Sequence, residues 1–390
     1  MKCSRLKVTL PISSALLVLF LTACASAPKE TWTRTGDPIT DGQTAIAQGP
    51  EKDRVLWQYR TGLAEFRKGN YAEAQRLFGD ALQRVGGIIG PDAAAKKSRG
   101  LFHEESKKTF IGEPYERVMA YFYAGILYWM NGEPDNARAC FRNGQLQDSD
   151  TENREYANDW VLMDYLDGFI SGRYFSDDSP DAFQRAQKSF KLGQLPPFSK
   201  TANTMVFLEF GQGPTKYATG EYGQELRIRP GHSVVQGAWV KVDNKAVRIG
   251  PYDDLNFQAT TRGGRVMDHI LANKAVFKTT TDTIGNAAIV GGAIAATQHG
   301  GEEVGVGLLA AGIISKVVAA ATTPAADIRT WDNLPGYISF VALDLPVGPH
   351  SATIQFTDAA GTILPSLTKT ISFSVSQGNS AVLFASDHNS

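Results

Sequence analysis

The chain has 390 residues, of which 43% are hydrophobic and 20% charged, and its formal net charge is −1. This composition is typical of globular proteins and excludes an intrinsically disordered chain. The near balance of 39 basic and 40 acidic residues argues against a nucleic-acid partner, and the length predicts two or three domains.

The N-terminal stretch has the layout of an export signal. A basic start is followed by an apolar run over residues 10–21 and then by small residues. The basic residues are Lys2, Arg5 and Lys7. The apolar run is shorter than the roughly 20 residues that a membrane-spanning helix needs, so a retained anchor is disfavoured. We therefore predict a signal peptide over residues 1–23.

The signal is followed by a cysteine in a specific setting. Leu21, Thr22, Ala23 and Cys24 resemble the lipobox of bacterial lipoproteins. The resemblance implies that Cys24 begins the mature chain and carries acyl chains such as palmitate, whereas an ordinary signal peptide would need no cysteine. In such lipoproteins an Asp after the cysteine favours the inner membrane, so Ala25 favours the outer membrane. We expect a lipid-anchored protein on the periplasmic face of the outer membrane.

Cysteine usage is sparse. Cys3 leaves with the predicted signal and Cys24 is predicted to be acylated, so Cys140 has no partner for an intramolecular disulfide. Because the periplasm is oxidising, a lone exposed thiol there would be a liability. We predict that Cys140 is buried in a helix and has no metal or redox role.

Residues 24–50 are predicted to form a flexible tether. They are rich in Thr, Gly, Pro, Asp and Gln and show no apolar period. A flexible segment of this length has a root-mean-square reach of about 28 Å, which would hold the folded part away from the membrane.

Residues 51–198 show apolar residues at helical spacing, which predicts a helical domain. The pattern resembles the tetratricopeptide (TPR) repeat, a pair of antiparallel helices in which small residues allow close approach. Gln58 stands where that family often has Trp, and the third unit is faint. The signature residues of the three units are Gly62, Gly69, Tyr71, Ala74, Phe78 and Ala81; Gly125, Tyr128, Gly132, Ala137 and Phe141; and Ala186 and Phe190.

Residues 118–130 contain no charged side chain, which predicts a central helix buried on all sides. Residues 110–117 (Phe-Ile-Gly-Glu-Pro-Tyr-Glu-Arg) precede this stretch, and we call them the first motif. They begin the helix with proline and acidic residues, which the helix dipole favours at this end. The first motif resembles a sequence found in an uncharacterised family of bacterial envelope lipoproteins with TPR-like repeats. The resemblance extends to the second motif, residues 330–335 (Thr-Trp-Asp-Asn-Leu-Pro), and to residues 345–348 (Leu-Pro-Val-Gly). That family brings no established activity.

From residue 199 the pattern changes to short strands with alternating apolar residues, separated by Gly and Pro. Antiparallel strands with one buried face are typical of a β-sandwich. The predicted fold class is therefore α+β: a TPR-like helical repeat domain (residues 51–198), then an antiparallel β-sandwich-like domain (residues 199–390).

The strand region contains a segment rich in Ala and Gly, at about residues 284–321, which predicts a helical hairpin. Small residues at helical spacing allow tight helix–helix packing. The arms, of ~14 and ~18 residues, are shorter than the roughly 20 needed to cross a bilayer. Packing on the protein's own domains is the favoured alternative, and docking onto a membrane or a partner is the other.

No motif for catalysis stands out. The six histidines are scattered, and His103 lacks the second His that a zinc helix would place at residue 107. The Gly-His-Ser at residues 231–233 lacks the pattern of a nucleophile elbow. We predict no enzymatic activity, no metal and no cofactor.

The best candidate for a binding site is a groove in the helical repeats. By their repeat positions, Tyr59, Phe66, Phe122 and Trp129 would face the concave side and could anchor a partner's peptide. The favoured alternative is that the insertion between the repeats or the strand domain covers these aromatic residues.

The expected function is that of a non-catalytic scaffold or accessory protein that binds another cell-envelope protein. Two alternatives stay open. One is an envelope polysaccharide or cell-wall hydrolase with carboxylates at the domain junction, and the other is a structural component of an export assembly.

Overall fold

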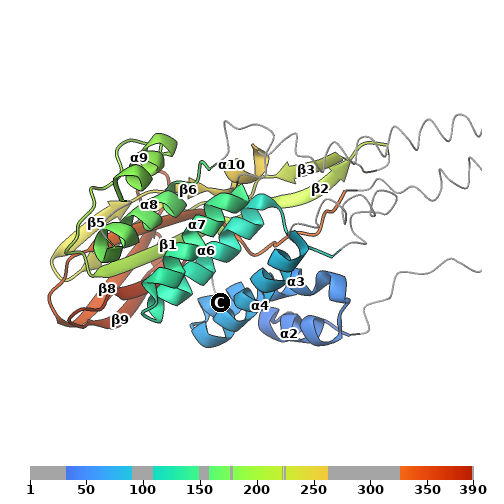
Figure 1. The fold of residues 1–390 in the computed structure, drawn as a ribbon, viewed down its shortest axis with the longest axis horizontal. Coiled ribbons are helices and arrows are strands. Elements are labelled where there is room, and N and C mark those ends of the chain that lie inside the picture. Colours follow the sequence, from blue (N-terminus) through green and yellow to red (C-terminus); the bar gives the residue numbers. More distant parts are fainter. Residues whose placement is uncertain are drawn as a thin grey trace, which may run out of the picture.

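The computed structural model describes residues 32–89, 109–148, 158–175, 179–221, 223, 225–261 and 326–388. The predicted signal peptide, the lipobox with Cys24 and the predicted hairpin at 284–321 lie outside the described residues. Within the described part, helices occupy the N-terminal region and β-sheets the C-terminal region (Figure 1). The α+β fold class is therefore confirmed in this coarse form.

The helical region contains consecutive helices, and short turns join α3 to α4 and α6 to α7. A π-helical turn, Ser171–Phe175, continues α8, and α10 lies among the strands. The helices are α2 (Pro38–Gln48), α3 (Arg54–Arg67), α4 (Tyr71–Ile89), α6 (Pro114–Met130), α7 (Pro134–Asp148), α8 (Val161–Ile170), α9 (Ser179–Ser189) and α10 (Leu255–Thr260). Helices α3 and α4, α6 and α7, and α8 and α9 pack against each other as pairs.

The first two pairs turn in the same way. Gly69 and Gly132 adopt left-handed backbone angles, with φ of 82° and 77°, which L side chains disfavour. After each glycine, the next backbone N–H donates to a carbonyl five residues back, from Asn70 to Glu65 and from Glu133 to Tyr128. This arrangement is a Schellman-type helix end, and it explains why glycine follows the last turn of α3 and of α6.

Close helix approach in these pairs depends on a glycine that faces a phenylalanine. A Cβ atom added at Gly62 would lie 3.3 Å from the Phe78 ring, and one added at Gly125 would lie 2.7 Å from the Phe141 ring. The third pair differs, because its closest glycine, Gly168, faces Ala182 and Phe183.

The signature predicted for the third repeat unit, Ala186 and Phe190, is therefore only partly reflected in the packing of α8 and α9. Ala186 is buried within α9. Phe190, in contrast, lies after the end of α9 and stacks on Tyr252, with ring centroids 5.5 Å apart. Phe190 does not fill a gap between the helices of its own pair in the way that Phe78 and Phe141 do.

Helix α6 is central, as its uncharged sequence predicts. Glu113 and Glu116 form a capping box at its start, in which the Glu113 N–H donates to the Glu116 carboxylate (2.6 Å). Val118, Met119 and Ala120 follow one another, so their side chains point about 100° apart around the helix, and all three are buried. Burial on all sides explains why residues 118–130 contain no charge.

Within the described residues, the strands form two four-stranded sheets and a two-stranded hairpin. The first sheet has the order β10 (Ala381–Ser386), β1 (Thr204–Gln212), β7 (Pro335–Leu343) and β6 (Asp253–Asp254). The second sheet has the order β5 (Lys245–Ile249), β4 (Gly237–Val242), β8 (Gly348–Thr357) and β9 (Lys369–Val375). The hairpin consists of β2 (Thr215–Thr219) and β3 (Glu225–Arg229).

One pairing in the first sheet corrects the prediction of an antiparallel domain. Strands β1 and β10 run parallel, with Thr204 opposite Ala381 and Glu209 opposite Ser386. The reason is topological: the chain leaves β9 in the second sheet and enters the first sheet beside β1, so β10 is not joined to β1 by a hairpin.

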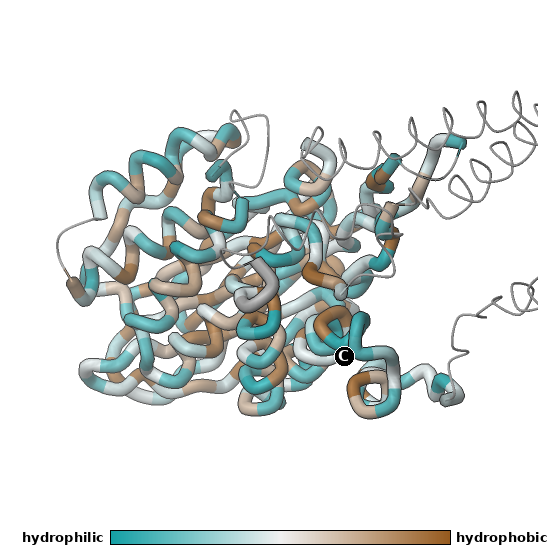
Figure 2. Tube along the Cα trace, turned by 45° about the vertical axis from the view of Figure 1, so that its right-hand side comes forward, coloured by the Kyte–Doolittle hydropathy of each residue, from teal (hydrophilic) through white to brown (hydrophobic). Residues whose placement is uncertain are grey.

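Strand β1 is buried on both faces because the first sheet lies between two layers. Met205 and Phe207 belong to the core shared with the helices, whereas Val206, Leu208 and Phe210 belong to the core shared with the second sheet. Along the helices, hydrophobic and hydrophilic stretches alternate, as expected for helices with one buried face (Figure 2). The predicted helical and strand domains are thus joined through a common hydrophobic core.

The prediction of a flexible tether at residues 24–50 is wrong for the second half of this segment. Helix α2 occupies Pro38–Gln48 and packs on α3. The side chain of Asp37 caps it by accepting the Thr40 N–H (2.7 Å), and proline stands at its first position. A cap followed by proline is a helix-start signal that the absence of an apolar period obscured.

Candidate functional site

The predicted partner groove is filled by the strand region. Tyr59, Phe66, Phe122 and Trp129 are all buried, at no more than 2% exposure. Trp331 stacks on Tyr59 (ring centroids 4.6 Å apart), and Phe384 of β10 packs on Phe66 (4.4 Å). The other two rings contact Phe207 of β1 at 5.9 and 6.1 Å. An open groove is therefore absent at these four residues, and the favoured alternative, that the strand domain covers them, is what the structure has.

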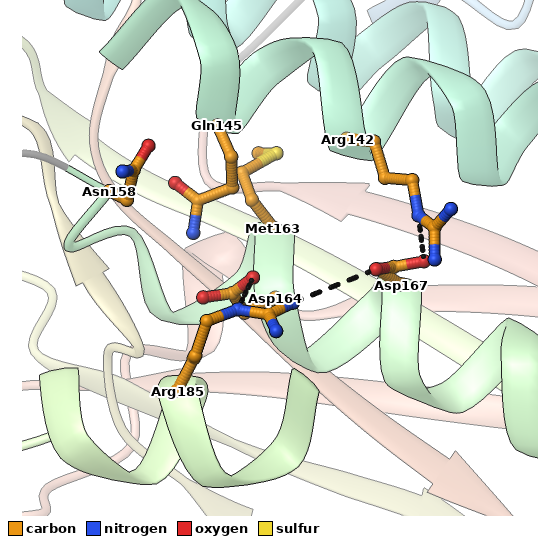
Figure 3. Close-up of a pocket in the computed structure, with 7 residues that line it drawn as sticks. All are labelled: Arg142, Gln145, Asn158, Met163, Asp164, Asp167 and Arg185. Carbon is orange, nitrogen blue, oxygen red and sulfur yellow. Dashed lines mark hydrogen bonds and ion pairs between the residues drawn. The ribbon is translucent and has the colours of Figure 1, made fainter. Parts of the chain in front are cut away.

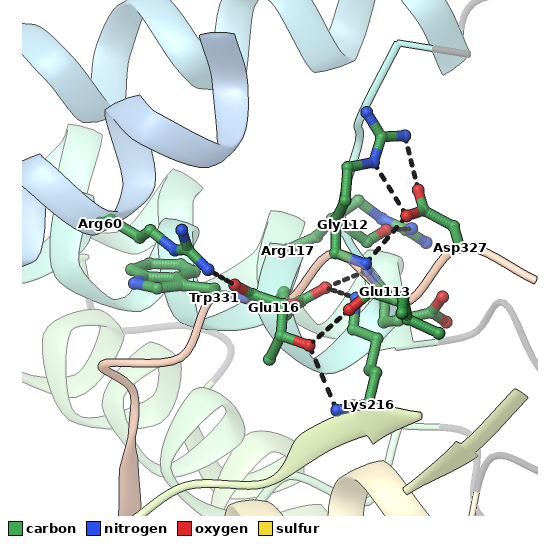
Figure 4. Close-up of polar contacts among 11 residues, drawn as sticks. Arg60, Gly112, Glu113, Glu116, Arg117, Lys216, Asp327 and Trp331 are labelled. Atoms are coloured by element: carbon green, nitrogen blue, oxygen red, sulfur yellow. Dashed lines mark hydrogen bonds and ion pairs between the residues drawn. The ribbon is translucent and has the colours of Figure 1, made fainter. Parts of the chain in front are cut away.

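The two sequence motifs meet at a buried ion pair (Figure 4). Glu116, from the first motif, accepts a hydrogen bond from Lys216 Nζ of β2 (2.6 Å). Its other carboxylate oxygen accepts the backbone N–H of Trp331, from the second motif (2.8 Å). The side chains of Glu116 and Lys216 are 0% and 1% exposed. We call Glu116, Lys216, Trp331, Arg60 and Asp332 the Glu116 cluster.

The remaining members of the cluster attach the second motif to α3. Arg60 donates to the carbonyl of Thr330 (2.6 Å) and forms an ion pair with Asp332 (2.9 Å). The side-chain amide of Asn333 donates a hydrogen bond to the Arg60 carbonyl (3.0 Å). Burial raises the pKa of Glu116, while the charge and hydrogen bond of Lys216 act in the opposite direction. The cluster therefore holds segments distant in sequence together without leaving an open cleft at this point.

A second buried ion pair joins α3, α6 and β1. Arg67 donates to Glu209 (2.5 Å), and Tyr123 donates to the other oxygen of the same carboxylate. Burial opposes ionisation of Glu209, but the charges of Arg67 and His388 and the hydrogen bonds outweigh it, so its pKa is lowered. Glu209 and Glu116 are thus both paired inside the protein, which differs from the open carboxylate pair that a hydrolase at the junction would need.

Asp253 links the first sheet to the helices in a different way. Its two carboxylate oxygens accept the backbone N–H groups of Val161 (2.8 Å) and Leu162 (2.9 Å) at the start of α8. Complete burial raises its pKa to about 7, and the two N–H donors only partly oppose this rise. Asp253, which belongs to β6, therefore caps the N-terminus of α8 and holds it against the first sheet.

A recess opens on the side of the helical layer, between α7, α8 and α9 (Figure 3). Its volume is about 290 Å³. We call it the α7–α9 pocket, and its lining residues are Arg142, Gln145, Asn158, Met163, Asp164, Asp167 and Arg185.

Ion pairs organise one side of this pocket. Arg185 donates to Asp164 Oδ1 (3.0 Å), and Arg142 donates to Asp167 Oδ1 (2.9 Å). Arg138 adds a second donor to Asp167 (3.0 Å). The carboxylates are almost fully buried, whereas the side chains of Arg142 and Arg185 are 47% and 52% exposed. Burial raises the pKa of Asp164 against the opposing charge of Arg185.

The Gln145 side chain lies close enough to Asp164 to act against the rise of its pKa. Two acceptors in the pocket nevertheless have no donor at hydrogen-bond distance and angle. These are Asp164 Oδ2 and Gln145 Oε1, and their residues are 3% and 9% exposed. The amide nitrogen of Gln145 is used elsewhere, because it donates to the Trp160 carbonyl (3.0 Å). An unpaired buried acceptor costs about 1–3 kcal/mol, so a ligand that supplied donors to these two atoms would recover that free energy on binding.

The α7–α9 pocket was not predicted from the sequence. Asp164 and Asp167 are the charged residues of an otherwise apolar helix, and they stand three positions apart, on one helix face. Two acids in a buried apolar helix are a usable signal, because buried charge needs a partner. The pairing arginines come from α7 and α9, and sequence spacing could not place them there.

Other predicted features can be placed as well. Cys140 is buried in α7 as predicted, and burial raises the pKa of its thiol to about 12. Across the described residues, no cluster of His, Cys, Asp and Glu could hold a metal ion. None of the helices in the described ranges combines the length and hydropathy required to cross a membrane.

No protein-family model matches this chain, and no curated protein or solved structure is significantly similar to it. The resemblances to bacterial lipoproteins and to TPR repeats therefore stay predictions.

Proposed function

We propose that this chain is a non-catalytic, lipid-anchored scaffold or accessory protein of the bacterial cell envelope, which binds another envelope protein. The observation that supports this proposal most directly is the closed junction between helices and strands. Its carboxylates, Glu116 and Glu209, are buried and ion-paired rather than facing each other across a cleft. A hydrolase with its site at this junction is correspondingly less well supported.

The helical layer is proposed to be a degenerate TPR-like stack. Support comes from two pairs in which a glycine meets a phenylalanine at the same sequence separation, Gly62 with Phe78 and Gly125 with Phe141. The same two pairs share their glycine turns. Since the strand region covers the aromatic face, partner binding is assigned to the outer side of the helices, where the α7–α9 pocket lies.

The attachment to the outer membrane is proposed from the sequence alone. Cys24 follows Leu21, Thr22 and Ala23 after an export-type signal. Two or more acyl chains on this residue would anchor the chain firmly, since each buried CH₂ contributes roughly 0.8 kcal/mol. Anchoring would restrict the protein to a surface and raise its effective concentration near membrane-bound partners.

The test compares the native chain with a Cys24→Ser variant in the envelope of the native host. Fractionation and fatty-acid labelling are expected to show a labelled, membrane-bound native chain and an unlabelled, released variant. Crosslinking followed by pull-down is expected to recover a specific envelope protein with the native chain and at least tenfold less of it with the variant. Equal labelling of both chains would overturn the anchor, and failure to recover a specific partner would overturn the scaffold function.

A further inference from the structure

The α7–α9 pocket has the properties of a binding site whose ligand must donate hydrogen bonds. Asp164 Oδ2 and Gln145 Oε1 both line it, both belong to residues that are more than nine-tenths buried, and neither has a donor. Gln145 of α7 and Asp164 of α8 are neighbouring side chains, and the amide nitrogen of Gln145 lies on the side of Asp164 (Figure 3). Such acceptors persist in a folded protein when something else supplies the donors.

The lining favours a compact cation over a planar one. Asp164 Oδ1 is already occupied by Arg185 (3.0 Å), so only one oxygen of this carboxylate is open to a ligand. A guanidinium binds carboxylates best through a fork of two parallel hydrogen bonds, which a single oxygen cannot accept. An ammonium group carries three rotatable donors, and each of them needs only a single acceptor oxygen such as Asp164 Oδ2 or Gln145 Oε1.

The size and the apolar wall indicate what carries the ammonium. A volume of about 290 Å³ lies at the lower limit of small-molecule pockets, so it suits a single side chain or a small amine. Met163 is buried and lines the same pocket, and its flexible thioether suits contact with an alkyl chain. The paired arginine and aspartate side chains around it leave the lining close to neutral.

From these observations we infer that the α7–α9 pocket binds a primary ammonium group on an unbranched alkyl chain. The group belongs either to a lysine side chain of a partner protein or to a free small amine. The site does not depend on lipid anchoring or on the scaffold function. If its donor is a partner's lysine, the pocket is also the recognition point of the proposed scaffold.

The experiment uses the mature chain with Cys24→Ser and methyl-labelled methionine, so that the Met163 methyl resonance reports on the pocket. The resonance is assigned with Met163→Leu. The probes are n-butylamine, its neutral analogue n-butanol, the N-acetylated peptide Gly-Lys-Gly, and the same N-acetylated peptide with norleucine in place of lysine. A saturable shift is expected with both amines, and the lysine peptide is expected to bind at least tenfold more tightly than the norleucine peptide.

Two variants complete the design. Asp164→Asn is expected to weaken amine binding at least tenfold without lowering the melting temperature. Asp181→Asn, which makes the same change at an exposed position of α9, is expected to leave binding unaltered. The comparison of lysine with norleucine needs no variant, so the inference stays testable even if Asp164→Asn fails to fold.

The outcomes separate the sources of the ammonium group. Tighter binding of the lysine peptide than of n-butylamine supports a partner's side chain, and equal binding supports a free amine. Absence of a saturable shift with either amine, or equal binding of lysine and norleucine peptides, overturns the inference. Amine binding combined with failure to capture a partner would retain the pocket and reject the scaffold function.

Discussion

The Glu116 cluster and the α7–α9 pocket differ in how completely their buried carboxylates are paired. Both contain nearly buried carboxylates paired with basic side chains. In the cluster the cation is buried too, and Lys216 and the Trp331 N–H occupy both oxygens of Glu116. In the pocket Arg185 is half exposed, and one oxygen of Asp164 has no donor. The difference indicates that the cluster serves the fold and that the pocket keeps capacity for a ligand.

The strongest test of this comparison is Glu116→Gln. The substitution keeps an acceptor for the Trp331 N–H but leaves Lys216 buried without a counter-charge. We expect the free energy of unfolding to fall by about 3–5 kcal/mol, measured by urea denaturation of the mature chain with Cys24→Ser.

Two further variants calibrate that result. Adding Lys216→Met to Glu116→Gln removes the stranded charge, so much of the lost stability is expected to return. Glu73→Gln breaks the partly exposed pair with Arg76 and is expected to cost less than about 1 kcal/mol. Equal losses for Glu116→Gln and Glu73→Gln would contradict a structural role for the cluster.

A pH series tests the third connection between layers, at Asp253. Burial raises its folded-state pKa from the ordinary 3.8 to about 7, so the folded chain holds this proton more strongly than the unfolded chain. The Asp253 contribution to stability therefore falls as pH rises from about 4 to about 7, and it is constant above that range. Relative to Asp253→Asn, the native residue is expected to lose a few kcal/mol over this window in urea titrations. Parallel profiles for the two chains would contradict this assignment.

A pair of glycine substitutions tests whether close helix approach matters. Gly125→Ala would place a Cβ atom 2.7 Å from the Phe141 ring, and we expect a loss of about 1–3 kcal/mol from overpacking. Gly79→Ala, on the exposed side of α4, meets nothing within 4 Å and is expected to stabilise the helix by about 0.5–1 kcal/mol. Thermal or urea unfolding separates the two, and a gain for both would remove the argument for a glycine-dependent contact.

Features with a local pattern were the predictable ones. The uncharged residues 118–130 predicted the buried helix α6, and alternating apolar residues predicted strands such as β7 and β8. The burial of Cys140 followed from chemistry, because an oxidising compartment disfavours an exposed thiol.

Features that depend on distant segments were not predictable in this way. The stacking of Trp331 on Tyr59 fills the expected groove, and these residues are far apart in the sequence. The parallel pairing of β1 with β10 depends on a crossover between sheets, which leaves no local trace. The pocket needed Arg142 and Arg185 to meet the acids of α8, so its chemistry was visible only in part.

The smallest expected effect on stability is the one that separates the two regions most sharply. Asp164→Asn makes the same carboxylate-to-amide change as Glu116→Gln, at a residue that is also nearly fully buried. Its cationic partner, Arg185, is half exposed and can be solvated, so losing the ion pair costs little. The asparagine oxygen can still accept the hydrogen bond that Arg185 donates to Asp164 Oδ1 in the native chain. We expect an unfolding free energy between unchanged and about 1 kcal/mol higher, since stability is commonly lower at sites kept for binding. A loss comparable to that of Glu116→Gln would show that Asp164 serves the fold, and the distinction between the two regions would no longer hold.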